Sequence, residues 1–176
     1  MPVNGCAEHS FLVRECIQDA KRSKRPIAVA FLDIANAFGS VPHSTLFGAL
    51  QWHGLAAESV HAVQRLYEDS YTKYRAALGT TDAITLREGV RQGCPLSPLI
   101  FNLTMEPILR HSASRNPGYL IRGCSVNLVA FADDVCLIAP SPNSLQLALD
   151  GISKAATQAG LVFKPAKCSS LVVSSR

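Results

Sequence analysis

The chain has 176 residues, 48% of them hydrophobic, and a formal net charge of +4. This length suits one domain or a large piece of one, with ample material for a core. No run reaches the ~18 apolar residues that span a bilayer, and residues 1–6 lack the pattern of a secretory signal. The charge is milder than that of a stand-alone nucleic-acid binder. Six cysteines without a C-x-x-C pair support reduced thiols in an intracellular protein better than a zinc site.

Regular elements are predicted in the first half from apolar periodicity and from Gly and Pro signals. Residues 6–24 have helical spacing, and Pro26 ends that helix. The apolar run over 27–34, broken only by Asp33, predicts a buried strand. The elements expected next are helices over 43–53 and 57–70 and a hairpin of 74–79 with 83–88, turning at 79–82.

The second half is expected to alternate helices with strands. A helix that is apolar almost all round starts at Ser97, should be buried, and should be kinked or shortened by Pro107. Two apolar runs meet at an Asp-Asp pair as a hairpin, a helix follows from Ser141 to Gly160, and a final strand pair covers 161–164 and 168–173. This order predicts an α+β fold, in which helices back a small antiparallel sheet.

A basic cluster precedes the first strong strand. It comprises Lys21, Arg22, Lys24 and Arg25. Cations suit the C-terminal end of a helix, so the cluster is either a solvated helix end or a contact for phosphate groups. The sequence alone leaves both interpretations open.

Three carboxylates are candidates for metal binding. Asp33 ends a buried strand, and Asp133 and Asp134 stand where two strands meet. Neighbouring strands of one sheet would bring them together although 100 positions separate Asp33 from Asp133. Hard cations such as Mg²⁺ prefer oxygen ligands, and a pair of them supports phosphoryl or nucleotidyl transfer. Taken singly, an Asp-Asp pair at a hairpin is ordinary turn chemistry.

The sequence motifs around these carboxylates favour a metal site over ordinary turn chemistry. The chain resembles the reverse transcriptase domain of non-LTR (LINE-like) retrotransposons, especially the site-specific kind, over nearly its whole length. Four blocks carry the resemblance, and they occur in the family's order: 31–43 (FLDIANAFGSVPH), 89–102 (GVRQGCPLSPLIFN), 131–134 (FADD) and 160–168 (GLVFKPAKC). The stretch 4–9 (NGCAEH), upstream of the first block, also resembles the family. The second block alone is highly specific.

The resemblance implies a role for each matching residue. Asp33 and Asp133 would be the main ligands of two Mg²⁺ ions, with Asp134 as an accessory carboxylate and the Ile34 carbonyl as a further ligand. Lys167 would protonate the pyrophosphate leaving group.

Other matching residues would bind nucleotide, template or primer. Phe38 would exclude the 2′-hydroxyl of an rNTP, although a core phenylalanine is an equal interpretation. Gln92 and Gly93 would border the incoming nucleotide and the templating base, and Phe131 would pack near the primer end. Arg91 would either meet a phosphate or pair with an acid.

The resemblance also sets the expected biology. It implies an RNA-directed DNA polymerase that binds an RNA template, a DNA primer and dNTPs, acts without a membrane and works inside the cell, in the nucleus. Residues 1–176 would be the palm with incomplete fingers and no thumb, completed by fingers, thumb and endonuclease segments of a longer protein. Gly39, where many relatives have Asp, departs from the pattern. One alternative is a silent remnant that binds RNA or protein. Another is a viral RNA-dependent RNA polymerase, which Phe38 disfavours.

Overall fold

The computed structural model describes residues 5–77 and 79–174. The chain divides into two compact units, which are described separately. The first consists of residues 1–35 and 108–176, and the second of residues 36–107. Among the described residues, no helix combines the length and apolarity that crossing a membrane requires.

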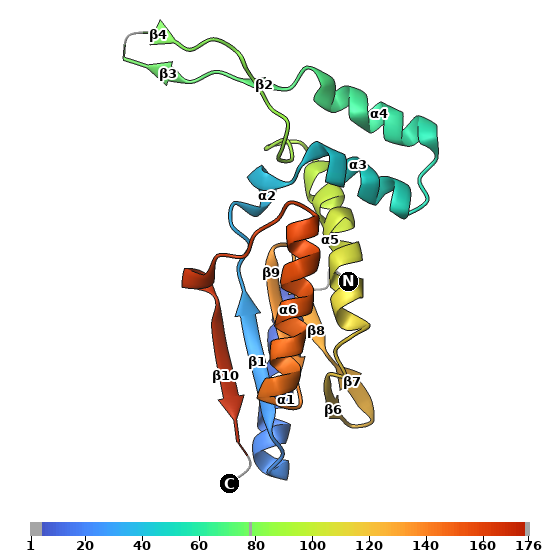
Figure 1. Ribbon diagram of the computed structural model, residues 1–176, viewed down its shortest axis with the longest axis vertical. Helices are drawn as coiled ribbons and strands as arrows, with labels where there is room; N and C mark the ends of the chain where they lie inside the picture. The colour runs from blue at the N-terminus through green and yellow to red at the C-terminus, as the bar shows by residue number, and fades with distance from the viewer. Residues whose placement is uncertain (1–4, 78, 175–176) are drawn as a thin grey trace. The chain divides into compact units, whose positions relative to one another are not determined.

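The first unit is built on a four-stranded antiparallel sheet in the order β10-β1-β9-β8 (Figure 1). Its strands are β1 (Ile27–Leu32), β8 (Leu128–Phe131), β9 (Asp134–Ala139) and β10 (Ser169–Val173). β1 and β9 are central, and their near-continuous apolar runs suit strands that are covered on both faces. The predicted small antiparallel sheet backed by helices is confirmed.

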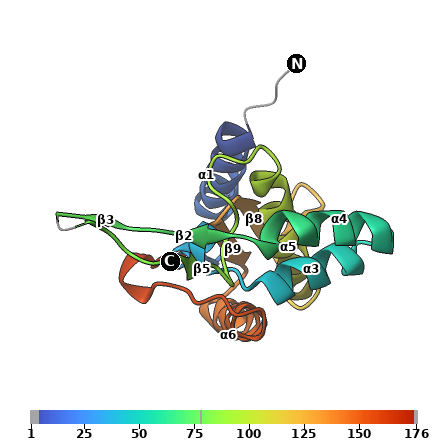
Figure 2. The ribbon, with the colours of Figure 1, turned by 90° about the horizontal axis from the view of Figure 1, so that it is seen from above.

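Two helices cover opposite faces of this sheet, α1 (Gly5–Ser23) on one and α6 (Pro142–Gln158) on the other (Figure 2). α6 begins as predicted, because the Ser141 hydroxyl accepts a hydrogen bond from the Ser144 N–H at 3.2 Å and Pro142 occupies the first turn. The core under α1 joins apolar side chains of the helix, the sheet and a small hairpin: Val13, Cys16, Ala20, Ile27, Val29, Tyr119, Ile121, Cys136 and Ile138.

The first unit departs from the sequence expectations in two places. The hairpin of β6 (Tyr119–Ile121) and β7 (Cys124–Val126) was not predicted. The expected strand over 161–164 is wrong: the structure gives only an isolated bridge between Ile34 and Phe163, then the 3-10 turn η1 (Pro165–Lys167). The short apolar run within 161–164 packs at the end of the sheet without adding a strand to it.

The second unit contains α2 (Ala37–Ser40), α3 (His43–Trp52) and α4 (Ala57–Glu68). α5 (Ser97–Ala113) begins in it, and residues from Ile108 onward belong to the first unit. Pro107 does not end α5, and Leu99 is 55% exposed, so the prediction of a helix buried all round is wrong. An amphipathic pattern is harder to detect when both faces are apolar.

The second unit also carries a narrow two-stranded arm (Figure 2). Its strands are β2 (Tyr71–Thr72), β3 (Arg75–Ala76), β4 (Gly79–Thr80) and β5 (Ile84–Thr85). β2 pairs with β5 and β3 pairs with β4, so the chain turns between Ala76 and Gly79. The turn predicted at 79–82 is therefore wrong. Gly79 has the positive φ typical of a turn but is part of β4.

Candidate active site

The pairing of β1 with β9 brings two of the predicted carboxylates together. Leu32 pairs with Val135, and continuing the antiparallel register by one residue places Asp33 alongside Asp134. Asp33 follows the buried strand β1 and Asp134 begins β9, whose other residues are buried, so the packing of these two strands fixes where the carboxylates emerge. Such burial contributes about 1.5–3 kcal/mol for each large apolar side chain, so the carboxylate positions are set by the core beneath them.

Asp133 occupies the two-residue turn between β8 and β9. Phe131 pairs with Asp134, which leaves Ala132 and Asp133 to reverse the chain. Ala132 has φ 55°, a left-handed conformation that costs an L-residue roughly 1 kcal/mol. Strain of this kind persists only where the surrounding structure imposes it. Here the paired strands impose it, and they hold Asp133 at the tip.

The backbone after Asp33 is fixed by the segment that precedes η1. The Lys164 N–H donates to the Asp33 carbonyl, and the Ala35 N–H donates to the Val162 carbonyl, each at 2.8 Å. Ile34, a predicted ligand through its carbonyl, lies between these bonds and bridges Phe163. Residues 162–164 therefore support the end of β1, a role that their apolar pattern did not reveal.

Lys167 lies against one of the predicted metal ligands. Its Nζ is 3.5 Å from Asp33 Oδ2, with the two side chains 58% and 25% exposed. A half-exposed ion pair of this kind contributes at most about 1 kcal/mol. Its importance is positional, because it places a mobile cation at the carboxylate.

The carboxylates meet the chemical requirements of a divalent cation only in part. Asp33 is accessible and already attracts a cation, and Asp134 is beside it, so the donor chemistry suits a hard ion. Across residues 5–77 and 79–174, however, no three Asp, Glu, His or Cys side chains gather closely enough to hold one. The residues that would hold an ion are Asp33, Asp133, Asp134 and the Ile34 carbonyl.

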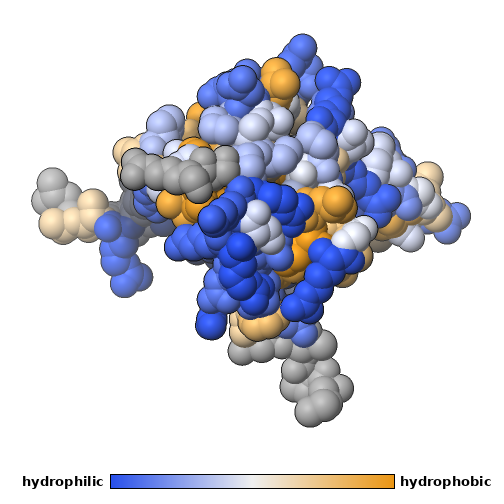
Figure 3. Space-filling model, turned by 90° about the horizontal axis from the view of Figure 1, so that it is seen from below, coloured by the Kyte–Doolittle hydropathy of each residue, from blue (hydrophilic) through white to orange (hydrophobic). Residues whose placement is uncertain are grey.

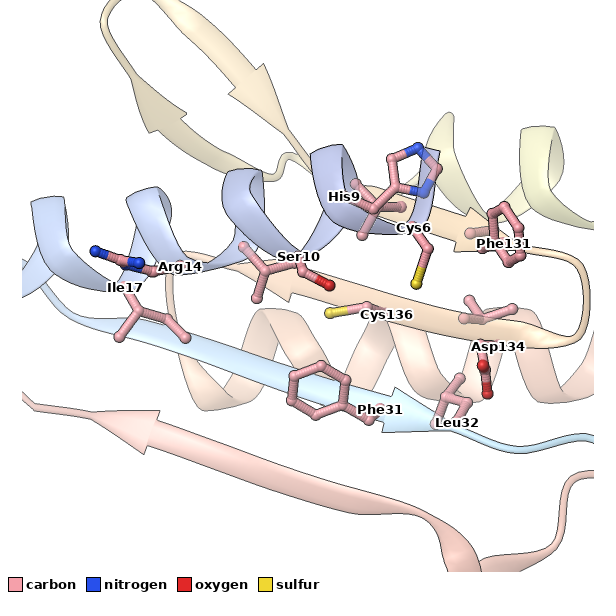
Figure 4. Close-up of a pocket in the computed structure, with 14 residues that line it drawn as sticks. Cys6, His9, Ser10, Arg14, Ile17, Phe31, Leu32, Phe131, Asp134 and Cys136 are labelled. Atoms are coloured by element: carbon pink, nitrogen blue, oxygen red, sulfur yellow. The ribbon is translucent and has the colours of Figure 1, made fainter. Parts of the chain in front are cut away.

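A pocket of about 520 Å³ opens next to Asp134, between α1 and the sheet (Figure 4). Phe31 and Phe131 line it and are 42% and 52% exposed, which leaves large aromatic surfaces beside the carboxylates. His9 and Arg14 of α1 contribute its polar lining. Phe131 was predicted to contact a primer, whereas Phe31 and the α1 residues were missed, since the pocket requires a helix far from β8 in sequence.

The second unit holds three of the predicted residues around a separate pocket of about 300 Å³. Arg91, Gln92 and Gly93 all line it. The Arg91 Nη1 donates to the Leu66 carbonyl at 2.6 Å, and Arg91 pairs with no acid among the described residues, so its contact with a phosphate stays a prediction. Gly93 has φ 81° and open space around its Cα, so it leaves room for a close ligand.

Cys94 follows directly at the start of the turn into α5. Hydrogen bonds from the Leu96 backbone and from Ser97 hold the pKa of the Cys94 thiol below its ordinary value, with a smaller contribution from Arg91. Donors and a cation near a helix N-terminus favour a thiolate. The backbone donors of this turn therefore favour negative charge.

Phe38 stacks on Phe101, with ring centroids 4.4 Å apart and an interplanar angle of 22°. Phe101 is fully buried, whereas Phe38 is half-buried. One ring face is thus supported by α5, and the residue is neither a fully buried core side chain nor a free one. Its predicted contact with a nucleotide sugar stays a prediction.

Comparison with known proteins identifies the family. A family model described as reverse transcriptase (RNA-dependent DNA polymerase) matches residues 2–175. The chain belongs to this family, and the predicted kinship with non-LTR elements is confirmed. It is 33% identical over 170 residues to the Pol polyprotein of the type-1 retrotransposable element R2 of Nasonia vitripennis, covering 97% of this chain. It is 32% identical over 168 residues to that of type-2 element R2DM of Drosophila melanogaster, covering 96%.

Solved structures support the palm-like fold. Apo telomerase from Candida tropicalis, truncated from its C-terminal domain, has a TM-score of 0.75 at 15% identity, over 97% of this chain and 36% of that one. Telomerase from Candida albicans in complex with a fragment of telomeric RNA has a TM-score of 0.69 at 13% identity, over 97% of this chain and 30% of that one. The chain spans only 16% of the length of each of these two R2 polyproteins. Reverse transcriptases in general require a divalent metal ion.

Proposed function

We propose that this chain is the catalytic palm of an RNA-directed DNA polymerase that copies RNA into DNA in non-LTR retrotransposition. One observation carries the proposal: the β1–β9 register aligns Asp33 with Asp134, next to the turn that holds Asp133. Family membership over residues 2–175 supports it. Its substrates would be an RNA template, a DNA primer and dNTPs, and its place of action the nucleus.

The chain's own residues would position reactants and neutralise charge. Asp33, Asp133, Asp134 and the Ile34 carbonyl would hold two Mg²⁺ ions. When bound, these would lower the pKa of the primer 3′-hydroxyl and neutralise the triphosphate. Lys167, which pairs with Asp33, would donate a proton to the departing pyrophosphate.

Further residues would contact the nucleic acid. Phe131, exposed at the end of β8, would pack near the primer end. Gln92 and Gly93, exposed before α5, would contact the nucleotide and the template base. Phe38, supported by Phe101, would present its edge to the sugar and exclude a 2′-hydroxyl. Fingers, thumb and endonuclease segments would be partners supplied by a longer protein.

Primer extension on poly(rA)/oligo(dT) by the complete gene product tests the proposal. Asp133→Asn replaces one carboxylate with a neutral amide and should reduce incorporation to background, because the negative charge that holds the metal ions is lost. Asp150→Asn is the matched control, because Asp150 is an exposed acid on α6 that bonds only Gln146 among the described residues. Synthesis that survives in Asp133→Asn would contradict the assignment.

The same assay separates the polymerase from a silent remnant. A remnant would bind hybrid but incorporate nothing in the wild type, with Mg²⁺ or with Mn²⁺. Incorporation that depends on Asp133 excludes the remnant, and preference for rNTPs over dNTPs would instead favour an RNA-dependent RNA polymerase.

A further inference from the structure

The basic cluster at the C-terminal end of α1 forms an exposed surface of the first unit. Lys21, Arg22 and Lys24 are exposed, and among the described residues none of the three side chains forms an ion pair. α1 ends at the bottom of Figure 1, and the view from below shows hydrophilic side chains in the middle of that face (Figure 3). These charges are solvated and available.

The backbone gives Lys24 an unusual position. The Arg25 N–H donates to the Ala20 carbonyl at 3.0 Å and the Lys24 N–H to the Lys21 carbonyl at 3.4 Å, the pattern of a Schellman helix end. Lys24 is the residue that this motif places in the left-handed region, at φ 50°. Glycine normally occupies this position, because a Cβ is strained there. A lysine therefore keeps a cation where the fold alone would favour glycine.

Arg25 is fixed in place, unlike its neighbours. Its Nη2 donates to Asp19 Oδ2 at 2.6 Å, and its guanidinium lies 4.8 Å from the centroid of the Tyr119 ring. The Tyr119 hydroxyl donates to the same Asp19 oxygen at 2.8 Å. Among the described residues, the hydrogen-bonded partners of Asp19 are thus Arg25 and Tyr119, and Arg22 interacts with Asp19 only through charge, without a close ion pair.

We infer that Lys21, Arg22 and Lys24 form a contact for the sugar-phosphate backbone of the nucleic acid held by the palm, several base pairs from the carboxylates. The inference rests on the proposed function. Lysine and arginine neutralise phosphates without regard to base sequence, which suits an enzyme that copies any template. β1 connects the two sites: its six residues at ~3.3 Å each span roughly 20 Å.

This separation predicts a dependence on duplex length. At ~3.4 Å per base pair, a duplex anchored at Asp33 reaches the cluster only after about six base pairs. The probe is therefore an RNA–DNA hybrid hairpin with a stem of about 4 or about 15 base pairs, bound to the complete gene product at several salt concentrations. Removing the basic cluster should therefore weaken binding of the long stem and leave binding of the short stem unchanged.

The test variant combines Lys21→Gln, Arg22→Gln and Lys24→Gly. For the long stem, the slope of log affinity against log salt should become shallower by ~0.9 for each cation that meets a phosphate. Lys24→Gly alone should weaken long-stem binding while leaving Tm unchanged or higher, because glycine relieves the left-handed strain. If Lys24 had only a structural role, Lys24→Gly would not weaken long-stem binding while the Tm stayed unchanged or rose. Lys154→Gln, at an exposed cation on α6, removes one charge as Lys24→Gly does and should leave the slope unchanged.

Three outcomes would overturn the inference. The triple variant could keep the wild-type affinity and salt slope, or it could lose affinity equally for the short and the long stem. In the third, poly-glutamate would displace the hybrid as efficiently as single-stranded RNA does. The last would assign the surface to an acidic polypeptide. Failure of the proposed function is separate. If the gene product makes no DNA but the triple variant still loses long-stem binding, the phosphate contact stands and the polymerase does not.

Discussion

Lys167 and Asp33 form an ion pair between η1 and the end of β1, with 3.5 Å between Nζ and Oδ2. The lysine expected to act on a leaving group thus contacts the carboxylate expected to bind metal. The backbone brings them together, because the N–H of Lys164, three residues before Lys167, donates a hydrogen bond to the Asp33 carbonyl. The ammonium group therefore occupies space that a metal ion at Asp33 would also require.

Replacing Lys167 with glutamine should change the metal requirement of DNA synthesis. Without the competing ammonium group, the Mg²⁺ concentration for half-maximal rate should fall about 2- to 5-fold, the equivalent of an exposed ion pair. The maximal rate should fall about a hundredfold, because a general acid is lost. Steady-state rates over a Mg²⁺ series measure both. Lys164→Gln is the control, since Lys164 contributes only backbone bonds among the described residues, and an unmoved Mg²⁺ curve in Lys167→Gln would exclude the competition.

Phe38→Val should relax sugar selection. The shorter side chain leaves room for a 2′-hydroxyl, so the ratio of kcat/KM for rNTP to that for dNTP should rise about tenfold or more. Loss of stacking on Phe101 should also cost about 1–3 kcal/mol of stability. Phe101→Leu provides the comparison, because it disturbs the same stack from the buried side. Equal changes of selectivity in both variants would show that Phe38 acts through packing alone.

The Tyr119–Asp19–Arg25 network should make stability depend on pH at both extremes. Hydrogen bonds from Tyr119 and then Arg25 hold the pKa of Asp19 below its ordinary value, so its contribution is present above about pH 4 and is lost as the pH falls further. Burial, followed by the bond to Asp19, raises the pKa of Tyr119 to about 12. The stabilising contribution of Tyr119 is therefore complete below about pH 10 and is lost as the pH rises from there toward 12.

Tyr119→Phe tests the alkaline limb of this dependence. The variant should lose about 1 kcal/mol at neutral pH, and its deficit relative to wild type should shrink above about pH 10. Urea unfolding at a series of pH values measures the difference. Cys136, whose pKa burial raises to about 12, destabilises both proteins equally over this range and cancels. Tyr71→Phe, at an exposed tyrosine, should show a constant difference; a constant difference in Tyr119→Phe would refute the linkage.

Gly89→Ala should destabilise the second unit by about 2 kcal/mol or more. Gly89 has φ 86°, and a Cβ there would lie 2.9 Å from the Gly39 carbonyl oxygen, so strain and a clash with backbone combine. Gly54→Ala separates the two effects, because Gly54 has φ 77° with open space around it. Thermal unfolding should place Gly54→Ala between wild type and Gly89→Ala. Equal losses would mean that the contact with Gly39 is relieved by movement of the loop.

The central strands, the helices other than the short α2, and the Asp-Asp hairpin were predictable because local pattern determines them. β1 and β9 are continuous apolar runs, and α6 begins at a Ser-Pro pair whose serine caps it. The alignment of Asp33 with Asp134 followed from assuming that these strands are neighbours. The register itself was not predictable, since it is set by side-chain packing across strands far apart in sequence.

Features that depend on tertiary contacts were missed. Residues 161–164 are apolar enough for a strand, but they instead hold the backbone after β1 in place through the hydrogen bonds of the Lys164 and Ala35 N–H groups. The ion pair of Lys167 and the pocket beside Phe31 both require elements that the sequence does not place together. Arg91 bonds the carbonyl of Leu66, 25 positions earlier in the chain, rather than an acid, and its contact with a phosphate stays a prediction.

The two-residue connection between β8 and β9 has a consequence for how copies of this gene can vary. One codon gained or lost in this turn would displace Asp133, and one gained or lost between Asp134 and Ala139 would move Asp134 out of its alignment with Asp33. Codons added between β3 and β4 would lengthen only the arm. Alleles that differ in length at the arm can therefore stay competent, whereas in-frame length changes at the Asp-Asp hairpin mark inactive copies.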